Sequence, residues 1–75
     1  RLHRDRGTVG DAESRADRAI KSSDWSSVRD YCTRYTDKSR KCAAAVALAA
    51  TKQGDLEEAC RLYKQLGRGK EHGCQ

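Results

Sequence analysis

The four cysteines of this chain are its most chemically distinctive residues: Cys32, Cys42, Cys60 and Cys74. Four cysteines permit three disulfide pairings or a metal site. Their spacings contain neither the tight C-x2–4-C pairs of structural zinc sites nor the C-x-x-C motif of redox-active dithiols. We therefore expect structural disulfides, with no bound metal or cofactor, in a periplasmic or extracellular location.

Residues that could support catalysis are few. The two histidines, His3 and His72, lie near the ends of the chain, and neither a catalytic triad nor a glycine-rich phosphate loop is recognisable. The adjacent acids Glu57 and Glu58 are better explained as the first turn of a helix, where carboxylates are favourable. We expect no enzymatic activity.

The composition indicates one small helical domain that needs covalent support. Of 75 residues, 36% are hydrophobic and 5% aromatic, and Pro is absent. Such a domain buries only about 60% of the surface of its unfolded chain, so disulfides commonly supplement its core. The longest apolar run, 42–50, is far shorter than the roughly 20 residues of a membrane-spanning helix. Because the chain starts at Arg1 rather than Met, we expect a processed protein or part of a larger one.

The sequence resembles itself at an offset of 31 residues. Small and turn-forming residues align with identical ones: Ala12 with Ala43, Ala16 with Ala47, Ala19 with Ala50, Lys21 with Lys52, and Asp24 with Asp55. Larger apolar positions also align: Trp25 with Leu56, Val28 with Ala59, Tyr31 with Leu62, and Tyr35 with Leu66. We therefore expect two similar units, at about 11–37 and 42–67, preceded by a basic entry segment at 1–10.

Each unit has the apolar spacing of a helical hairpin. The first helices are expected at about 11–22 and 39–53. The second helices carry apolar stripes: Val28, Tyr31, Cys32 and Tyr35, then Ala59, Leu62, Tyr63 and Leu66. The predicted fold is all-α, with two antiparallel helical hairpins (four helices) stacked together.

The predicted turns carry typical helix-ending and helix-starting residues. Gly54 suits the end of a helix, whereas the first unit has Ser23 at the equivalent position. Asp24 and Asp55 are expected N-caps, and Glu58 predicts a capping box with Asp55.

The segment 43–64, with its alanine-rich first helix, Gly-Asp turn and Glu-Glu-Ala motif, resembles a tetratricopeptide-like repeat. It is also similar to the related Sel1-like repeats, some of which connect successive hairpins through cysteines. The resemblance extends over about 11–67. It implies that a peptide or protein binds along the surface formed by the first helix of each hairpin.

The turns favour one pairing of the cysteines. Cys32 and Cys42 lie about five residues before and after Asp37, and Cys60 and Cys74 lie seven before and after Gly67. Residues equally far from a turn face each other in an antiparallel hairpin, within disulfide distance. We therefore predict the disulfides Cys32–Cys42 and Cys60–Cys74, the second tying back a tail at 68–75. Each is expected to add about 3 kcal/mol. The nearest alternative to this interpretation is a mitochondrial coiled-coil-helix protein. The nine residues between Cys32 and Cys42 match the cysteine spacing of that family, but the spacing of Cys60 and Cys74 does not.

The helix at 39–53 is apolar nearly all round. A helix of this kind is normally enclosed in a core, and the alternative is that part of it lines an exposed groove. From the resemblance, and from the positions facing away from Ala43, Ala47 and Ala50, the candidate binding residues are Asp17, Lys21, Ala45, Leu48, Ala49 and Lys52.

Charge is unevenly distributed along the hairpins. Basic residues gather at one pole: Arg34, Lys38, Arg40, Lys41, Arg68 and Lys70. Bases at the ends of helices suit the helix dipole, and the alternative is a binding surface for an anionic partner. We do not expect a nucleic-acid partner, because of the oxidising location and the few aromatic residues.

Together these features predict a protein–protein interaction or scaffold module of an exported, larger protein, with a protein or peptide partner. The alternative is a secreted cationic helical peptide that binds an anionic lipid, polysaccharide or nucleic acid through its basic pole. No transmembrane segment is expected in this part of the protein.

Overall fold

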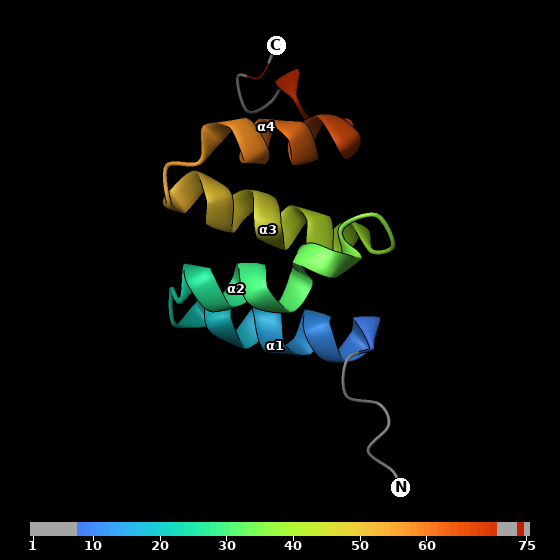
Figure 1. Ribbon diagram of the computed structural model, residues 1–75, viewed down its shortest axis with the longest axis vertical. Helices are drawn as coiled ribbons and strands as arrows, with labels where there is room; N and C mark the ends of the chain where they lie inside the picture. Colours follow the sequence, from blue (N-terminus) through green and yellow to red (C-terminus); the bar gives the residue numbers. More distant parts are fainter. Residues whose placement is uncertain (1–7, 71–73, 75) are drawn as a thin grey trace, which may run out of the picture.

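A computed structural model describes residues 8–70 and 74, which form four α-helices and, within those residues, no strand (Figure 1). The helices are α1 (Val9–Lys21), α2 (Trp25–Cys32), α3 (Arg40–Lys52) and α4 (Leu56–Gln65), with a short 3-10 turn, η2 (Thr33–Tyr35), after α2. Consecutive helices run antiparallel, so that α1 and α2 form one hairpin and α3 and α4 a second one stacked on it. The predicted all-α fold is confirmed. The predicted entry segment 1–10 and tail 68–75 lie partly outside the described residues. His3 and His72 lie wholly outside them.

Each α-helix begins at a residue whose side-chain oxygen accepts the backbone N–H three residues later. These N-caps are Thr8, Asp24, Ser39 and Asp55. Such caps satisfy amide groups that have no partner within the helix. The two predicted aspartate caps are confirmed.

The predicted capping box at Asp55 is wrong. Its second half requires the Glu58 carboxylate to accept the backbone N–H of Asp55. That N–H donates instead to the carbonyl oxygen of Ala50 at 2.8 Å, and the Glu58 carboxylate accepts two hydrogen bonds from Arg61. The charged guanidinium one turn further along is the stronger partner for this carboxylate.

The turns within the two hairpins have the same hydrogen bonds, 31 residues apart. The N–H of Asp24 donates to the carbonyl of Ala19 at 2.8 Å, as that of Asp55 does to Ala50. Both turns need a left-handed backbone: φ is +58° at Ser23 and +83° at Gly54. Glycine adopts this conformation without steric cost and serine does not, so only the second turn has its optimal residue.

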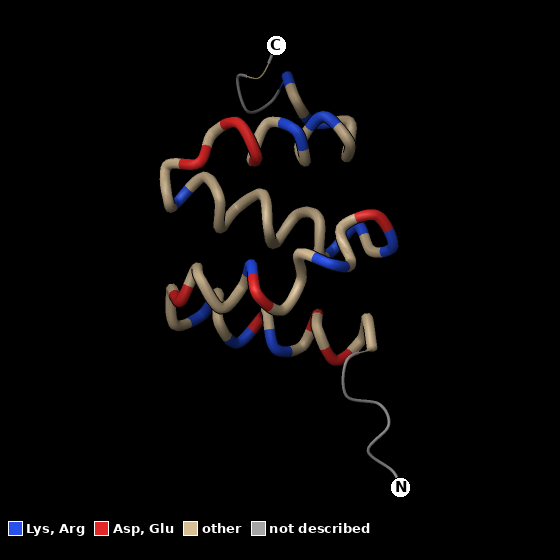
Figure 2. The backbone as a smooth tube through the Cα atoms, viewed as in Figure 1, with Lys and Arg blue, Asp and Glu red and all other residues tan. Residues whose placement is uncertain are grey.

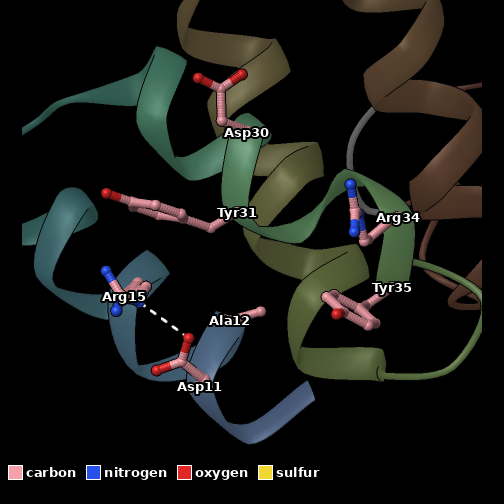
Figure 3. Close-up of a pocket in the computed structure, with 7 residues that line it drawn as sticks. All are labelled: Asp11, Ala12, Arg15, Asp30, Tyr31, Arg34 and Tyr35. Carbon is pink, nitrogen blue, oxygen red and sulfur yellow. Dashed lines mark hydrogen bonds and ion pairs between the residues drawn. The ribbon is translucent and has the colours of Figure 1, made fainter. Parts of the chain in front are cut away.

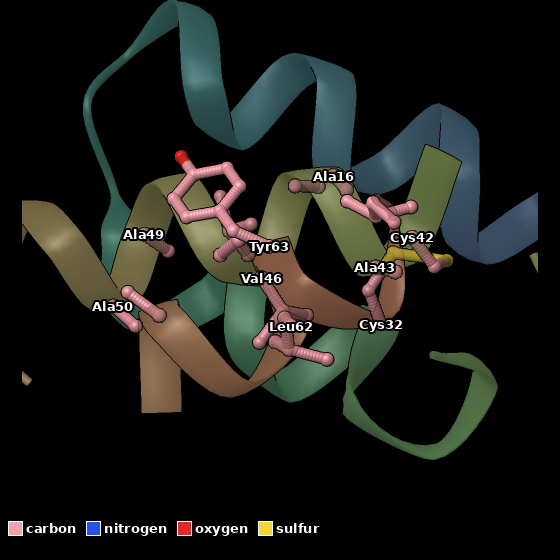
Figure 4. Packing of buried hydrophobic residues seen from close by; sticks show 14 of the residues in the cluster. Ala16, Cys32, Cys42, Ala43, Val46, Ala49, Ala50, Leu62 and Tyr63 are labelled. Atoms are coloured by element: carbon pink, nitrogen blue, oxygen red, sulfur yellow. A yellow bond between two sulfur atoms is a disulfide. The ribbon is translucent and has the colours of Figure 1, made fainter. Parts of the chain in front are cut away.

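Helix α3 is the centre of the core, since it contacts each of the other three helices. Six of its residues are fully buried: Cys42, Ala43, Val46, Ala47, Ala49 and Ala50. They pack with residues of the other helices, among them Ala16, Leu62 and Tyr63 (Figure 4). The expectation of an enclosed core helix is therefore confirmed.

Tyr31 is the main exception among the predicted core stripes. It is 36% exposed, although its stripe neighbours Val28 and Cys32 are completely buried. The burial of α2 is centred on Val28 and Cys32, which face α3, and Tyr31 points to the opposite side of the hairpin. The apolar pattern alone did not separate these two sides.

The structure contains the two predicted disulfides. Cys32–Cys42 has a Cα–Cα distance of 5.0 Å and connects α2 to α3, and Cys60–Cys74 has one of 5.5 Å and connects α4 to the chain after it. Cys32 and Cys42 are completely buried, whereas Cys60 and Cys74 are partly exposed. Stable disulfides of this kind indicate an oxidising setting.

Candidate functional site

The predicted surface on the first helices of the hairpins is only partly accessible. Leu48 is half-buried and Lys52 exposed, but Ala45 and Ala49 are 9% and 0% exposed and cannot line an open groove. The accessible face of α3 instead passes through Lys41, Ala44, Leu48 and Lys52, which recur at helical spacing. Ala45 and Ala49 lie one residue, about 100°, further round this face, on the side that packs inside the domain.

Two cross-helix contacts hold α1 against the start of α3. Lys41 Nζ lies 3.5 Å from Asp17 Oδ2, and the hydroxyl of Ser39 donates to the carboxylate of Glu13. Asp17, a predicted binding residue, is therefore neutralised by Lys41, which was predicted as part of the basic pole. Its charge is not available to a partner without breaking this ion pair.

The other end of the same surface is positively charged. Lys21 and Lys52 occupy the last turns of α1 and α3, which run parallel, and neither has an ion-pair partner among the described residues. Lys52 Nζ lies 6.0 Å from the centroid of the Trp25 ring, a weak attraction at an exposed site. We use "α1–α3 surface" for Lys21, Ala44, Leu48 and Lys52, which combine apolar area with two cations.

A shallow cleft that sequence reasoning missed lies on the outer side of α1 and α2 (Figure 3). It consists of two adjoining hollows of about 270 and 220 Å³ that share Arg15 and Tyr31. Arg15 pairs with Asp11 at 2.9 Å, which raises the pKa of the arginine, and its guanidinium carbon lies 5.8 Å from the centroid of the Tyr31 ring. Because Tyr31 fits the core stripe of α2 by spacing, nothing in the sequence marked it as exposed.

The backbone positions of the predicted basic pole lie along the α2–α3 connection and after α4, at the same end of the helices (Figure 2). Arg40 donates to the carbonyl of Leu66 at 3.3 Å, which brings the α2–α3 connection against the end of α4. Four of the six predicted cations have no ion-pair partner among residues 8–70 and 74: Arg34, Lys38, Arg68 and Lys70. Lys41 turns away towards α1.

The acidic turns at the other end are occupied by contacts between the hairpins. Arg29 lies 3.1 Å from the carboxylate of Asp55 and donates to the side-chain oxygen of Gln53 at 2.9 Å. Gln53 in turn donates to the hydroxyl of Ser26 at 3.1 Å. These residues hold the two hairpins together, so this end has a structural role.

No known protein family, curated protein or solved structure matches this chain. Within the described residues, no helix is long and apolar enough to cross a membrane. The same residues contain no group of three or more His, Cys, Asp or Glu side chains arranged to hold a metal ion. The α1–α3 surface, the outer cleft and the basic pole are thus the candidate sites.

Proposed function

We propose that this domain is a protein-interaction module of an exported, larger protein, and that it binds a peptide or protein along the α1–α3 surface. The observation that carries the proposal is the half-buried Leu48 one turn before Lys52 on α3, with Lys21 at the same end of the parallel helix α1. Neither lysine has a carboxylate partner among the described residues. The resemblance to tetratricopeptide-like repeats, whose first helices bind peptides, supports the same surface.

The partner that fits this surface is acidic and carries an apolar side chain. Packed helices typically lie about 8–10 Å apart, and an extended peptide rises about 3.3 Å per residue. We therefore propose a peptide whose carboxylates are about three residues apart, one for each lysine. An apolar side chain between those carboxylates would cover Leu48. Asp17 pairs with Lys41, which offsets the charge of this acid towards such a peptide.

The disulfides support a periplasmic or extracellular location for the module. Cys32 and Cys42 are buried where α2 meets α3, so an oxidised bond connects the two hairpins inside the core. Cytosolic thiols are kept reduced, whereas these compartments allow such a bond to persist.

The test uses a labelled peptide with two glutamates three residues apart and a leucine between them. Its binding to the intact domain is measured by fluorescence anisotropy at low and physiological salt. The double variant Lys21→Glu, Lys52→Glu is expected to bind at least tenfold more weakly, because two attractive contacts become repulsive. Lys64→Glu, an exposed lysine on α4, is the matched control and should bind within twofold of the wild type. Unchanged binding by the double variant, with its helical circular dichroism intact, would contradict the proposal.

A second candidate function is binding of an anionic surface through the basic pole. The four cations without ion-pair partners at this pole favour it. Sedimentation with vesicles containing anionic phospholipid would then fall steeply between 50 and 300 mM salt and would be lost in Arg34→Glu, Lys38→Glu. Equal sedimentation of this variant and the wild type would contradict the pole as the binding site.

A further inference from the structure

Five residues of the first hairpin face the second hairpin and hold it in place. Each has a specific partner there: Glu13 with Ser39, Asp17 with Lys41, Trp25 with Lys52, Arg29 with Asp55, and Cys32 with Cys42. We call these five residues the inner face of α1–α2. They come from both helices of the hairpin, so a single side of α1–α2 is responsible for the stacking.

The residues 31 positions later occupy the equivalent side of the second hairpin. They are Ala44, Leu48, Leu56, Cys60 and Tyr63, which we call the outer face of α3–α4. The two acids and the arginine of the inner face are replaced by alanine, leucine and cysteine. The equivalent side of the second hairpin is therefore more apolar than the side that stacks in the first.

Much of this outer face is uncovered in the described part of the chain. Leu56 is 61% exposed, the highest exposure of any large hydrophobic side chain there, and Ala44 and Leu48 are half-buried. Only its far edge is enclosed: Tyr63 is 8% exposed, the N–H of Arg68 donates to its carbonyl at 2.7 Å, and Cys60 is bonded to Cys74. An apolar surface with a closed edge remains along α3 and the start of α4.

The opposite end of the stack has the reverse character. Cys42, Val46, Ala49 and Leu62 are all completely buried in the second hairpin. Their equivalents in the first hairpin are Asp11, Arg15, Arg18 and Tyr31, the polar residues that line the outer cleft. Charged residues at stacking positions are typical of the terminal unit of a helical stack, so this end is closed to a further hairpin.

We propose that the outer face of α3–α4 binds an amphipathic helix, which packs on it as α3 packs on the inner face of α1–α2. The occupant needs a face of small and apolar residues, since α3 itself presents Cys42, Val46 and Ala49 at helical spacing. It does not need lysines like Lys41 and Lys52, because the outer face has no acid and no Trp to receive them. This surface shares Ala44 and Leu48 with the α1–α3 surface, and it differs from that surface in Leu56, Cys60 and Tyr63 of α4.

A second copy of the chain stacked head to tail is a poorer occupant. It would place the charged residues Asp11, Arg15 and Arg18 of one copy against Leu48 and Leu56 of the other. Burying those charges against apolar side chains is unfavourable. We therefore assign this helix to a partner protein.

The test adds a synthetic helical peptide to the intact, oxidised domain and follows the backbone amide signals by NMR. The peptide, about 18 residues long so that it can be helical, carries Ala and Leu on one face and Glu and Lys on the other. A scrambled peptide of the same composition, without an apolar face, is the matched control. Signals of Ala44, Leu48 and Leu56 should shift with the amphipathic peptide only, and those of Asp11, Arg15 and Arg18 should not.

Leu56→Glu provides the matched variant test. It should weaken binding at least tenfold, while Arg18→Glu on the closed end should bind within twofold of the wild type. The fold should survive, since residue 56 is exposed and glutamate is favourable in the first turn of a helix. The neutral variant Leu56→Gln adds no negative charge beside Lys52, so it should weaken binding of the amphipathic helix and leave the acidic peptide of the α1–α3 surface unaffected. Lys21→Glu, Lys52→Glu should not affect the amphipathic helix, so each proposal can fail separately.

Three results would overturn the inference. The first is that no amide signal shifts at up to millimolar peptide, and the second is that only signals of other surfaces shift. The third is that signals of the outer face shift when the protein alone is concentrated. The last would mean that a second copy is the occupant.

Discussion

The two disulfides should contribute unequally to stability, although they close loops of similar size. Their cysteines are 10 and 14 positions apart, and the chain-entropy model assigns each about 3 kcal/mol. That value assumes that the native state is unchanged when the bond is removed. This holds for Cys32–Cys42, which lies between two packed helices, but not for Cys60–Cys74, which ties down only the chain after α4.

The expected loss for Cys32→Ala, Cys42→Ala is about 4–5 kcal/mol. The loop term gives about 3 kcal/mol. Deleting two completely buried sulfur atoms adds about 1–2 kcal/mol if each counts as one methylene-sized group. A domain of 75 residues is typically stable by only about 4–11 kcal/mol, so this variant should be close to unfolding.

The expected loss for Cys60→Ala, Cys74→Ala is below about 1.5 kcal/mol. Its freed tail regains conformational freedom in the folded protein as well as in the unfolded one, so most of the loop term cancels. Both variants are measured by urea denaturation followed by far-ultraviolet circular dichroism, with the oxidised wild type as reference. Equal losses, or a larger loss for Cys60→Ala, Cys74→Ala, would refute the assignment of these roles.

Three further changes test other parts of the fold. Ser23→Gly should raise the urea midpoint by the equivalent of about 1 kcal/mol, and Gly54→Ser should lower it by a similar amount, because both residues adopt positive φ. A lower midpoint for Ser23→Gly or a higher one for Gly54→Ser would contradict this. Leu62→Ala should destabilise by about 2–5 kcal/mol, since the side chain is completely buried, and a loss below 1 kcal/mol in the same denaturation assay would contradict its place in the core. Hydrogen bonds from Arg61 lower the pKa of Glu58 in the folded protein. The pair therefore stabilises the fold fully above about pH 4.3, the ordinary pKa of a glutamate. This stabilisation is lost as the pH falls through the lowered pKa of the folded protein. Thermal melts from pH 2 to 7 should show this loss, at most about 0.5 kcal/mol, in the wild type and not in Glu58→Gln.

The disulfide pairing was predictable because it follows from turn positions alone. Once two helices are joined by a short connection, residues equally far from it must lie opposite each other. Cys32 and Cys42 satisfy this about the α2–α3 connection, and the structure places their Cα atoms 5.0 Å apart. The aspartate N-caps were predictable for a similar reason, since they depend on a few neighbouring residues.

The accessible face of α3 was not predictable, because its sequence has no polar contrast. Between Cys42 and Ala50 every residue is apolar, so periodicity cannot show which side faces water. The assignment of Ala45 and Ala49 to the surface failed for this reason. Tyr31 was misplaced because an aromatic residue at helical spacing fits either side of an amphipathic helix, and only the position of α3 separates the two.

The thin core gives the exposed leucines their significance. Alanines let α3 approach its neighbours closely, but each buries little apolar area, and among the fully buried side chains the largest are Leu62, Val28 and Val46. Burying a leucine completely is worth about 2 kcal/mol, more than twice the contribution of a methyl group. A chain that buries so few large side chains nevertheless leaves Leu48 and Leu56 accessible on one face, where the first hairpin has Asp17 and Trp25 in contact with Lys41 and Lys52 of the second. Sequestering these two leucines beneath a partner helix would add apolar burial that the four helices alone do not supply, and so binding on this face should also raise the free energy of unfolding of the domain.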